Sequence, residues 1–297
     1  MASLLETKKK IGSIKNMKKI TKAMQLVAAS KMKFFQQKAM HSRGYIYSLL
    51  HVLDLYLDSS EDTLYTQKRT EGDTLFVLYA SDKGLCGSLN NQLSKALIAS
   101  KEWSSLPEKE RKLITIGKKA FDYARSNGIT PRLSFSGIKE KAGILDMLPV
   151  VGEILELWKT GTVKKVYMIT PHYKNSFVFY PHVKELLPFS REMIESYRIE
   201  HDFPPHPTRK VSELSFKEPT AERVLRTLMK QVIVGAFVQS LYELKASEYS
   251  SRMIAMKNAT DSADKIIKQK TVEYNKIRQQ NITQQIAEIS AAADAIS

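Results

Sequence analysis

The sequence has little proline and glycine in its two terminal segments, and only one cysteine in all. Within the 297 residues, the stretches 3–57 and 221–297 contain no proline and together only three glycines. Because both residues interrupt helices, their scarcity favours one long helix at each end of the chain. The single cysteine, Cys86, excludes an intramolecular disulfide and is typical of a reducing compartment.

Long apolar runs are also missing. The best candidate, residues 232–238 (VIVGAFV), is far shorter than the roughly 20 residues that a helix needs to span a bilayer. The first dozen residues carry their lysines after the few apolar ones, unlike a secretory signal peptide. With 43% hydrophobic residues, the sequence predicts a soluble protein that can form a core.

The net charge of +15 is concentrated near the N-terminus. Residues 1–43 hold eleven Lys or Arg and one acid, Glu6, whereas the other 254 residues hold 35 basic and 30 acidic side chains. Such a segment suits an acidic protein partner, nucleic acid or an anionic membrane surface, although a solvated helix face explains any single lysine. A nucleic-acid binder would normally add stacking aromatics, and only Phe34 and Phe35 occur up to residue 40.

Both terminal segments show apolar or small residues at alternating steps of three and four, which is the pattern of a helix that packs on a partner helix. The N-terminal seam is Ile14, Met17, Thr21, Met24 and Ala28. The C-terminal seam is Met253, Met256, Thr260, Ala263, Ile267, Lys270, Tyr274 and Ile277, followed after five residues by Ile282, Ile286, Ile289, Ala293 and Ile296. Because long helices gain most of their stability from packing, we expect an antiparallel coiled coil.

The middle of the chain alternates between strand and helix patterns. We expect extended segments at 73–81, 112–117, 130–137, 163–175 and 176–188, helices at 88–103, 118–128 and 142–161, and an irregular surface connection at 188–219. Such alternation predicts an α/β fold with a mostly parallel, Rossmann-like sheet. The expected organisation is therefore an N-terminal helix (1–57), an inserted α/β domain (72–220) and a C-terminal helix (221–297).

One turn, SDKGLCGSLN (81–90), is a candidate ligand site because it links a predicted strand to a predicted helix. It matches neither glycine signature for phosphate binding, and no histidine near Cys86 in sequence could activate the thiol. A tight turn around a buried thiol is the favoured interpretation, with an enzyme acting through Cys86 as an alternative. The six histidines show no metal-ligand spacing, so we expect no catalytic residue, cofactor or metal.

Three motifs together resemble the gamma subunit of bacterial F-type ATP synthases. They are IGSIKNMKKITKAMQLVAASKM (11–32), SDKGLCGSLN, and the C-terminal segment from ASEYSSRMIAMKNATDSAD to YNKIRQQNITQQIAEI. The resemblance implies a non-catalytic central-stalk rotor subunit. Its coiled coil would stand inside a hexamer of alternating α and β subunits, and its α/β domain would lie near the ε subunit and the membrane c-ring. Proton flow through the ring would then drive ATP synthesis at the β subunits.

The resemblance also implies coupling contacts with β at Met24, Arg252, Gln279 and Thr283. Met24 is equally explained as a seam residue, and the other residues as ordinary surface positions. The sequence departs from the family pattern at Lys83, Ser88, Gln285 and Ala292.

The resemblance further implies where the protein acts. The cysteine pair of the chloroplast form is absent, and a helix from about Ser3 leaves no room for a transit peptide. We therefore expect a bacterial protein bound peripherally at the cytoplasmic face of the plasma membrane, without direct insertion and without nucleic acid.

Overall fold

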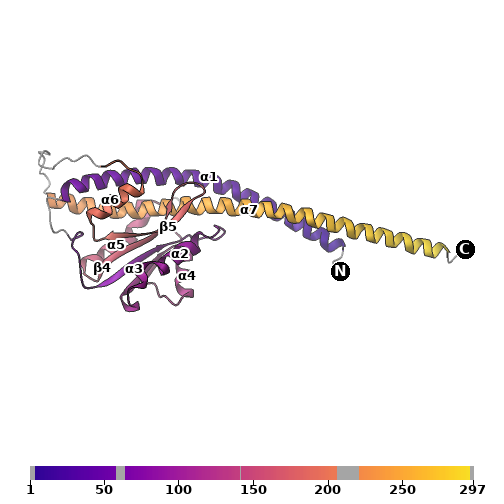
Figure 1. Ribbon diagram of the computed structural model, residues 1–297, viewed down its shortest axis with the longest axis horizontal. Helices are drawn as coiled ribbons and strands as arrows, with labels where there is room; N and C mark the ends of the chain where they lie inside the picture. The colour runs from indigo at the N-terminus through magenta and orange to yellow at the C-terminus, as the bar shows by residue number, and fades with distance from the viewer. Residues whose placement is uncertain (1–3, 58–63, 141, 206–220, 295–297) are drawn as a thin grey trace. The chain divides into compact units, whose positions relative to one another are not determined.

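The computed structural model describes residues 4–57, 64–140, 142–205 and 221–294. The two predicted terminal helices are α1, Leu4–Leu57, with 54 residues, and α7, Ala221–Asp294, with 74 residues (Figure 1). The chain divides into two compact units: the coil unit, residues 1–29 and 252–297, and the sheet unit, residues 30–251. Each unit therefore contains part of α1 and part of α7, and the boundaries fall inside these helices.

The sheet unit is built on five strands in the order β3-β2-β1-β4-β5. Strands β3, β2, β1 and β4 run parallel, and only β5 runs antiparallel to its neighbour. This confirms the predicted α/β class with a mostly parallel sheet. The strands are β1 Asp73–Tyr79, β2 Arg111–Ile116, β3 Leu133–Phe135, β4 Val163–Tyr173 and β5 Phe179–Leu187.

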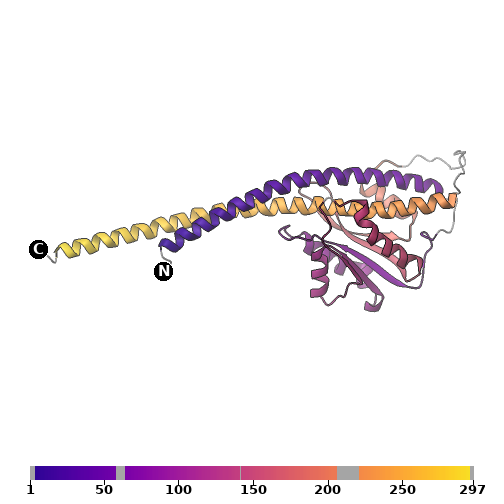
Figure 2. The ribbon, with the colours of Figure 1, turned by 180° about the vertical axis from the view of Figure 1, so that it is seen from behind.

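Helices cover both faces of the sheet. Phe76 of β1 packs edge-on against Trp103, whereas the Tyr79 hydroxyl donates to the Phe237 carbonyl of α7. Because residues 76 and 79 differ by an odd number, their side chains point to opposite faces. Figure 2 shows α5 on the same side of the sheet as α1 and α7. The shorter helices are α2 Leu89–Ala99, α3 Lys101–Ser104, the 3₁₀ turn η1 Glu108–Glu110, α4 Lys118–Ser126, α5 Ile144–Lys159 and α6 Arg191–Glu200.

Two helix predictions need correction. The helix expected over 88–103 is interrupted at Ser100, whose extended backbone and hydroxyl, an acceptor for the Trp103 amide, begin a new helix, α3. The irregular connection expected over 188–219 contains α6, which begins at the N-cap Ser190. Ile194 is the one fully buried residue of α6, so the helix leaves too weak a periodic signal to be read from sequence.

The helix segments of the sheet unit belong to the same hydrophobic core as the sheet. Ile46 and Leu50 of α1 and Ile233 and Phe237 of α7 are all buried there with β1. Gly235 allows the close approach of these helices, since a Cβ at this position would lie 3.3 Å from the Ile46 side chain. The unit therefore depends on both ends of the sequence for its core.

One described segment, residues 223–292 of α7, is long and apolar enough to cross a membrane by length and composition alone. However, 56% of its most apolar 18-residue window is buried inside the protein, and core helices of soluble proteins pass the same test.

Candidate contact surface and buried polar cluster

In the coil unit, two polar contacts fix the register of α1 against α7. The hydroxyls of Thr21 and Thr260 lie 2.8 Å apart, and Lys18 Nζ lies 2.5 Å from the Asp264 carboxylate. The lower residue number on α1, Lys18, thus pairs with the higher residue number on α7, Asp264. This confirms the predicted antiparallel pairing.

The seam predicted on α1 is wrong at one position. Met17 is 58% exposed, whereas its neighbour Lys18 is partly buried and takes the seam position through its ion pair with Asp264. The other four predicted positions are buried or partly buried. On α7 every predicted position from Met253 to Ile277 is at least partly buried, Lys270 included.

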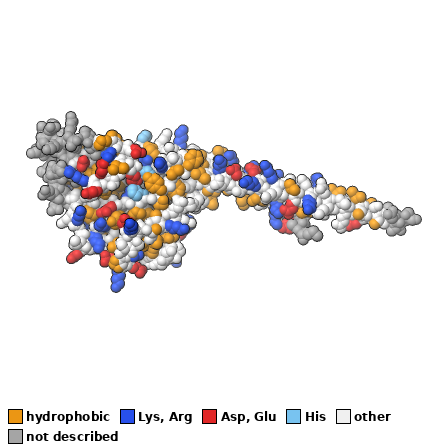
Figure 3. Space-filling model, viewed as in Figure 1, with side chains coloured by type: hydrophobic (Ala, Val, Ile, Leu, Met, Phe, Trp, Pro, Cys, Tyr) orange, Lys and Arg blue, Asp and Glu red, His pale blue; other side chains and the backbone are white. Residues whose placement is uncertain are grey.

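Beyond Ile277 the environment of α7 changes. Every side chain over residues 278–292, here called the exposed tail, is exposed, including Ile286 at 62% and Ile289 at 70%. The predicted seam is therefore wrong at Ile282, Ile286 and Ile289, which contact no helix in the described part of the chain. The register places Leu4, the first described residue of α1, opposite about residue 278, so the described part of α1 ends where the exposed tail begins. Hydrophobic side chains show on the surface at this end of α7 in Figure 3. The last two predicted seam positions, Ala293 and Ile296, lie where no side chain is described.

The four predicted β contacts do not form one cluster. Gln279 and Thr283 are exposed and one turn apart on the tail, and Met24 is partly buried in the seam. Arg252 is only 8% exposed, so reading it as a surface residue is wrong. It lies 27 positions before Gln279, which is roughly 40 Å along a helix.

The turn at residues 81–90 is held by its own side chains. Asn90 Oδ1 accepts the Ser81 amide at 3.0 Å, and Asn90 Nδ2 lies 3.3 Å from the Cys86 sulfur. Cys86 is 2% exposed, which confirms the predicted tight turn around a buried thiol. The Asp82 carboxylate accepts the Lys118 amide at 2.8 Å, so a protein carboxylate already occupies the N-terminus of α4.

A cluster of polar side chains is buried within the sheet unit, at the meeting of α1, α7 and β4. Glu243 on α7 accepts hydrogen bonds from Arg43 Nε at 2.9 Å, from Gln239 at 2.8 Å and from the Tyr173 amide at 3.2 Å. Arg43 also donates to the Tyr173 carbonyl at 2.5 Å. Although burial raises the pKa of Glu243, the positive charges of Lys184 and Arg43 and these hydrogen bonds lower it to about 2.

Histidines extend this cluster toward α6. Glu200 Oε1 lies 2.7 Å from Nδ1 of His172 and 2.7 Å from Nδ1 of His182. Burial raises the pKa of Glu200, but these hydrogen bonds and the charge of Lys184 outweigh it and hold the pKa far below its usual range. The His201 ring stacks on His172 with ring centres 5.0 Å apart. Burial, and then the charge of Lys184, lowers the pKa of His201 to about 3.

Sequence reasoning missed this cluster, and its separations explain why. His172 is the last but one residue of β4, His201 follows α6 and Glu243 lies on α7, so 29 and 42 residues separate them. No local motif connects residues so far apart. The sequence signal was a set of polar residues in otherwise apolar elements, such as Glu243 in the buried stretch of α7.

Comparison with known proteins gives a consistent result. A family model described as ATP synthase matches residues 3–296. The central stalk and c-ring structure of the mitochondrial ATP synthase of Tetrahymena thermophila contains a chain that is 25% identical, with a TM-score of 0.55, covering 81% of this chain and 99% of that one.

Two structures of the mitochondrial ATP synthase of Euglena gracilis also match, each with a chain that is 18% identical. The first, of OSCP, F1 and c-ring in rotational state 3, has a TM-score of 0.67 and covers 99% of this chain and 94% of that one. The second, of the rotor in rotational state 1, has a TM-score of 0.62 and covers 94% and 98%.

Proposed function

Because the chain belongs to the gamma-subunit family of ATP synthase, we propose that it is the central-stalk rotor subunit of such a synthase and transmits torque between a membrane c-ring and catalytic β subunits. Its partners are the α and β subunits, the ε subunit and the c-ring. It acts peripherally at the cytoplasmic face of a bacterial plasma membrane and couples proton flow to ATP synthesis or hydrolysis.

The observation that carries this proposal is the exposed tail. A single helix that presents Ile282, Ile286 and Ile289 to solvent leaves an apolar stripe without cover from the described part of its own chain. Contiguous exposed apolar surface of this kind marks a protein contact. The cavity of an α/β hexamer would surround such a helix on all sides, which suits a tail whose side chains are exposed all round.

The contacts that couple rotation to catalysis would include Gln279 and Thr283. Both side chains are exposed and hydrogen-bonding, and their spacing presents them to one surface. Met24 and Arg252 complete the proposed set, with the difference that both are at least partly buried within this chain. A contact with a moving loop of β is worth about 0.5–3 kcal/mol, depending on whether it is charge-assisted.

The test uses the purified complex carrying Gln279→Ala with Thr283→Val. Because both side chains are exposed, we expect normal subunit content together with slower ATP hydrolysis and slower ATP-driven proton pumping. Gln269→Ala is the matched control, since Gln269 is an exposed glutamine on the same helix, before the tail. Wild-type rates in the double variant would remove these residues from the coupling mechanism, and loss of assembly would assign them a structural role.

The subunit would itself be non-catalytic. The turn at 81–90 is filled by its own side chains, and the buried Cys86 thiol offers no accessible nucleophile. We expect the purified chain alone to bind no ATP or ADP, and Cys86→Ser to leave the activity of the complex largely intact. Tight, stoichiometric nucleotide binding by the chain alone would contradict this part of the proposal.

A further inference from the structure

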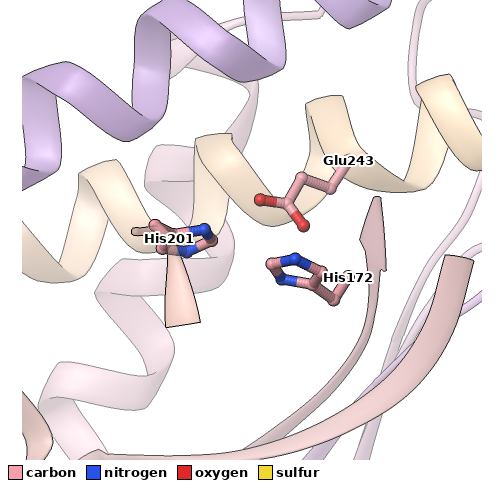
Figure 4. Close-up of side chains that lie close together, drawn as sticks. All are labelled: His172, His201 and Glu243. Carbon is pink, nitrogen blue, oxygen red and sulfur yellow. The ribbon is translucent and has the colours of Figure 1, made fainter. Parts of the chain in front are cut away.

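The polar cluster brings two imidazoles and a carboxylate to one point. One ligand atom from each of His172, His201 and Glu243 lies within 4.8 Å of the other two. Figure 4 shows the three side chains pointing toward one another from different parts of the fold. Two histidines with one carboxylate form a common ligand set for Zn²⁺.

The His201 imidazole has a buried nitrogen without a hydrogen-bond partner among the described residues. The His201 side chain is fully buried, and its Nδ1 makes no hydrogen bond. The His172 side chain is 5% exposed, and its Nδ1 lies 2.7 Å from Glu200 Oε1. Leaving a buried polar atom unsatisfied costs about 1–3 kcal/mol, so the His201 Nδ1 atom requires an explanation. A cation bound at this nitrogen supplies one.

The groups around the three side chains match those that support a metal. Glu200 Oε1 lies 2.7 Å from His172 Nδ1, in position to orient this ring and leave its Nε2 for a metal. Glu243 accepts three hydrogen bonds, and a carboxylate has about four acceptor sites, so one remains. The charges of Arg43 and Lys184 oppose a cation, but those of Glu200 and Glu243 offset them.

A cavity lies beside the cluster. A cavity of about 500 Å³ is bounded by α6, β5 and α7, and its lining includes His182, Tyr197, Glu200 and Gln239. Gln239 hydrogen-bonds Glu243 and lies 3.3 Å from the His201 ring, so the cavity is lined by a residue that contacts two of the three side chains. A hydrated ion in this cavity would lie next to Gln239, one residue away from the three side chains.

We propose that His172, His201 and Glu243 bind one divalent transition-metal ion, of which Zn²⁺ fits best, inside the sheet unit. Imidazole ligands favour Zn²⁺ over Mg²⁺ or Ca²⁺, which prefer oxygen. The ligand atoms, which lie within 4.8 Å of one another, would have to approach to the roughly 3.4 Å that a tetrahedral ion with bonds of about 2.0–2.1 Å requires. The ion ties β4, the end of α6 and α7 together.

The test is titration of the purified full chain with ZnCl₂, followed by calorimetry, and with CoCl₂, followed by visible absorption. We expect one ion per chain, a tetrahedral Co²⁺ spectrum and a melting temperature raised by Zn²⁺ but not by Mg²⁺. His172→Ala and His201→Gln should each abolish tight binding, and Glu200→Gln should weaken it about 10–100-fold. His41→Ala is the matched control, because His41 is exposed on α1.

Several results would overturn the proposal: no tight Zn²⁺ binding by the wild-type chain, or binding that survives both histidine substitutions. Circular dichroism checks that each variant folds. If the variants do not fold, X-ray absorption at the zinc edge of the wild-type protein decides, since two imidazole nitrogens and a carboxylate oxygen at about 2.0–2.2 Å are required. A shell of oxygens alone would refute the assignment.

Discussion

Two parts of one helix, α7, differ in how far their side chains are buried. Between Val232 and Ser251, in the sheet unit, it is buried at most positions, polar ones included, whereas over residues 278–292, in the coil unit, every side chain is exposed. The buried stretch contains Gly235 and many β-branched and aromatic residues, which are poorer helix formers than the alanines and glutamines of the exposed stretch. Tertiary packing of its apolar side chains, and not helical propensity, therefore decides how much each part contributes to the stability of this chain.

The contrast extends to how the two units use charge. The sheet unit buries the Arg43–Glu243 pair, with side chains 10% and 2% exposed. The coil unit pairs Lys18 with Asp264 at 38% and 44% exposure, where water weakens the attraction. Substitutions in the sheet unit should therefore change folding, and substitutions in the tail should change only what the complex does.

The largest effect is expected from breaking the buried pair. Glu243→Ala leaves the Arg43 guanidinium buried without its carboxylate, and should lower the free energy of unfolding by about 3–5 kcal/mol. Urea unfolding of the purified chain, followed by circular dichroism, measures this. Arg43→Met combined with Glu243→Leu should recover part of the loss, although the Tyr173 amide then has no acceptor. A cost below 1 kcal/mol for Glu243→Ala would mean that water reaches the pair.

The next effect is a dependence of stability on pH. The pKa of His201 is about 3 in the folded chain, against 6.5 ordinarily, so between these values only the unfolded chain binds the proton. Stability should therefore fall as the pH drops from about 6.5 toward 3, by about 1.4 kcal/mol per pH unit. Glu243, with a folded pKa of about 2, adds to the loss only below about 4.5.

Urea unfolding in EDTA at pH 7, 6 and 5 isolates the histidine contribution, because carboxylates hardly titrate there. His201→Gln should flatten the profile in this range. A wild-type profile that is already flat would show that the His201 ring takes up its proton in the folded chain at its ordinary pKa.

The sequence was sufficient for features that repeat along the chain. The apolar run of β1 predicted a buried strand, and the spacing from Met253 to Ile277 predicted the seam of α7. The sequence-based prediction was wrong where a single polar contact decides which of two adjacent residues lies in the seam. Lys18, and not Met17, lies there because it forms an ion pair with Asp264. A pattern of apolar residues contains no information on such an ion pair. The histidine cluster also lay beyond prediction, because its members come from β4, the end of α6 and α7, and only the tertiary packing of these elements brings them together.

A smaller effect tests the register of the coil unit. In a Cys86→Ser background, Thr21→Cys with Thr260→Cys should form a disulfide on oxidation, because the two hydroxyl oxygens lie only 2.8 Å apart. Met17→Cys with Thr260→Cys is the matched control, since Met17 is 58% exposed and should not cross-link. Non-reducing electrophoresis distinguishes them. Equal cross-linking of both pairs would mean that the seam is not fixed at this position.

The smallest effect on folding is expected in the exposed tail. Ile286→Ala should change the free energy of unfolding by less than about 0.5 kcal/mol, because the side chain is 62% exposed. Ile233→Ala, on the same helix but fully buried, should cost about 2–5 kcal/mol. The same urea titration compares the two isoleucines directly.

In the assembled complex we expect substitutions in the exposed tail to have a clear effect, on the stability of the assembly. Ile286→Ala with Ile289→Ala removes apolar surface that the proposed α/β hexamer would cover, at roughly 25 cal/mol per Å², so the purified complex should lose subunits more readily on dilution. The folding of the chain should not change. If the tail variant instead destabilises the isolated chain, its isoleucines are already covered there, by self-association, and light scattering would then show an oligomer. If neither assembly nor folding changes, the apolar stripe has no partner in the complex, and the observation that carries the rotor proposal is lost.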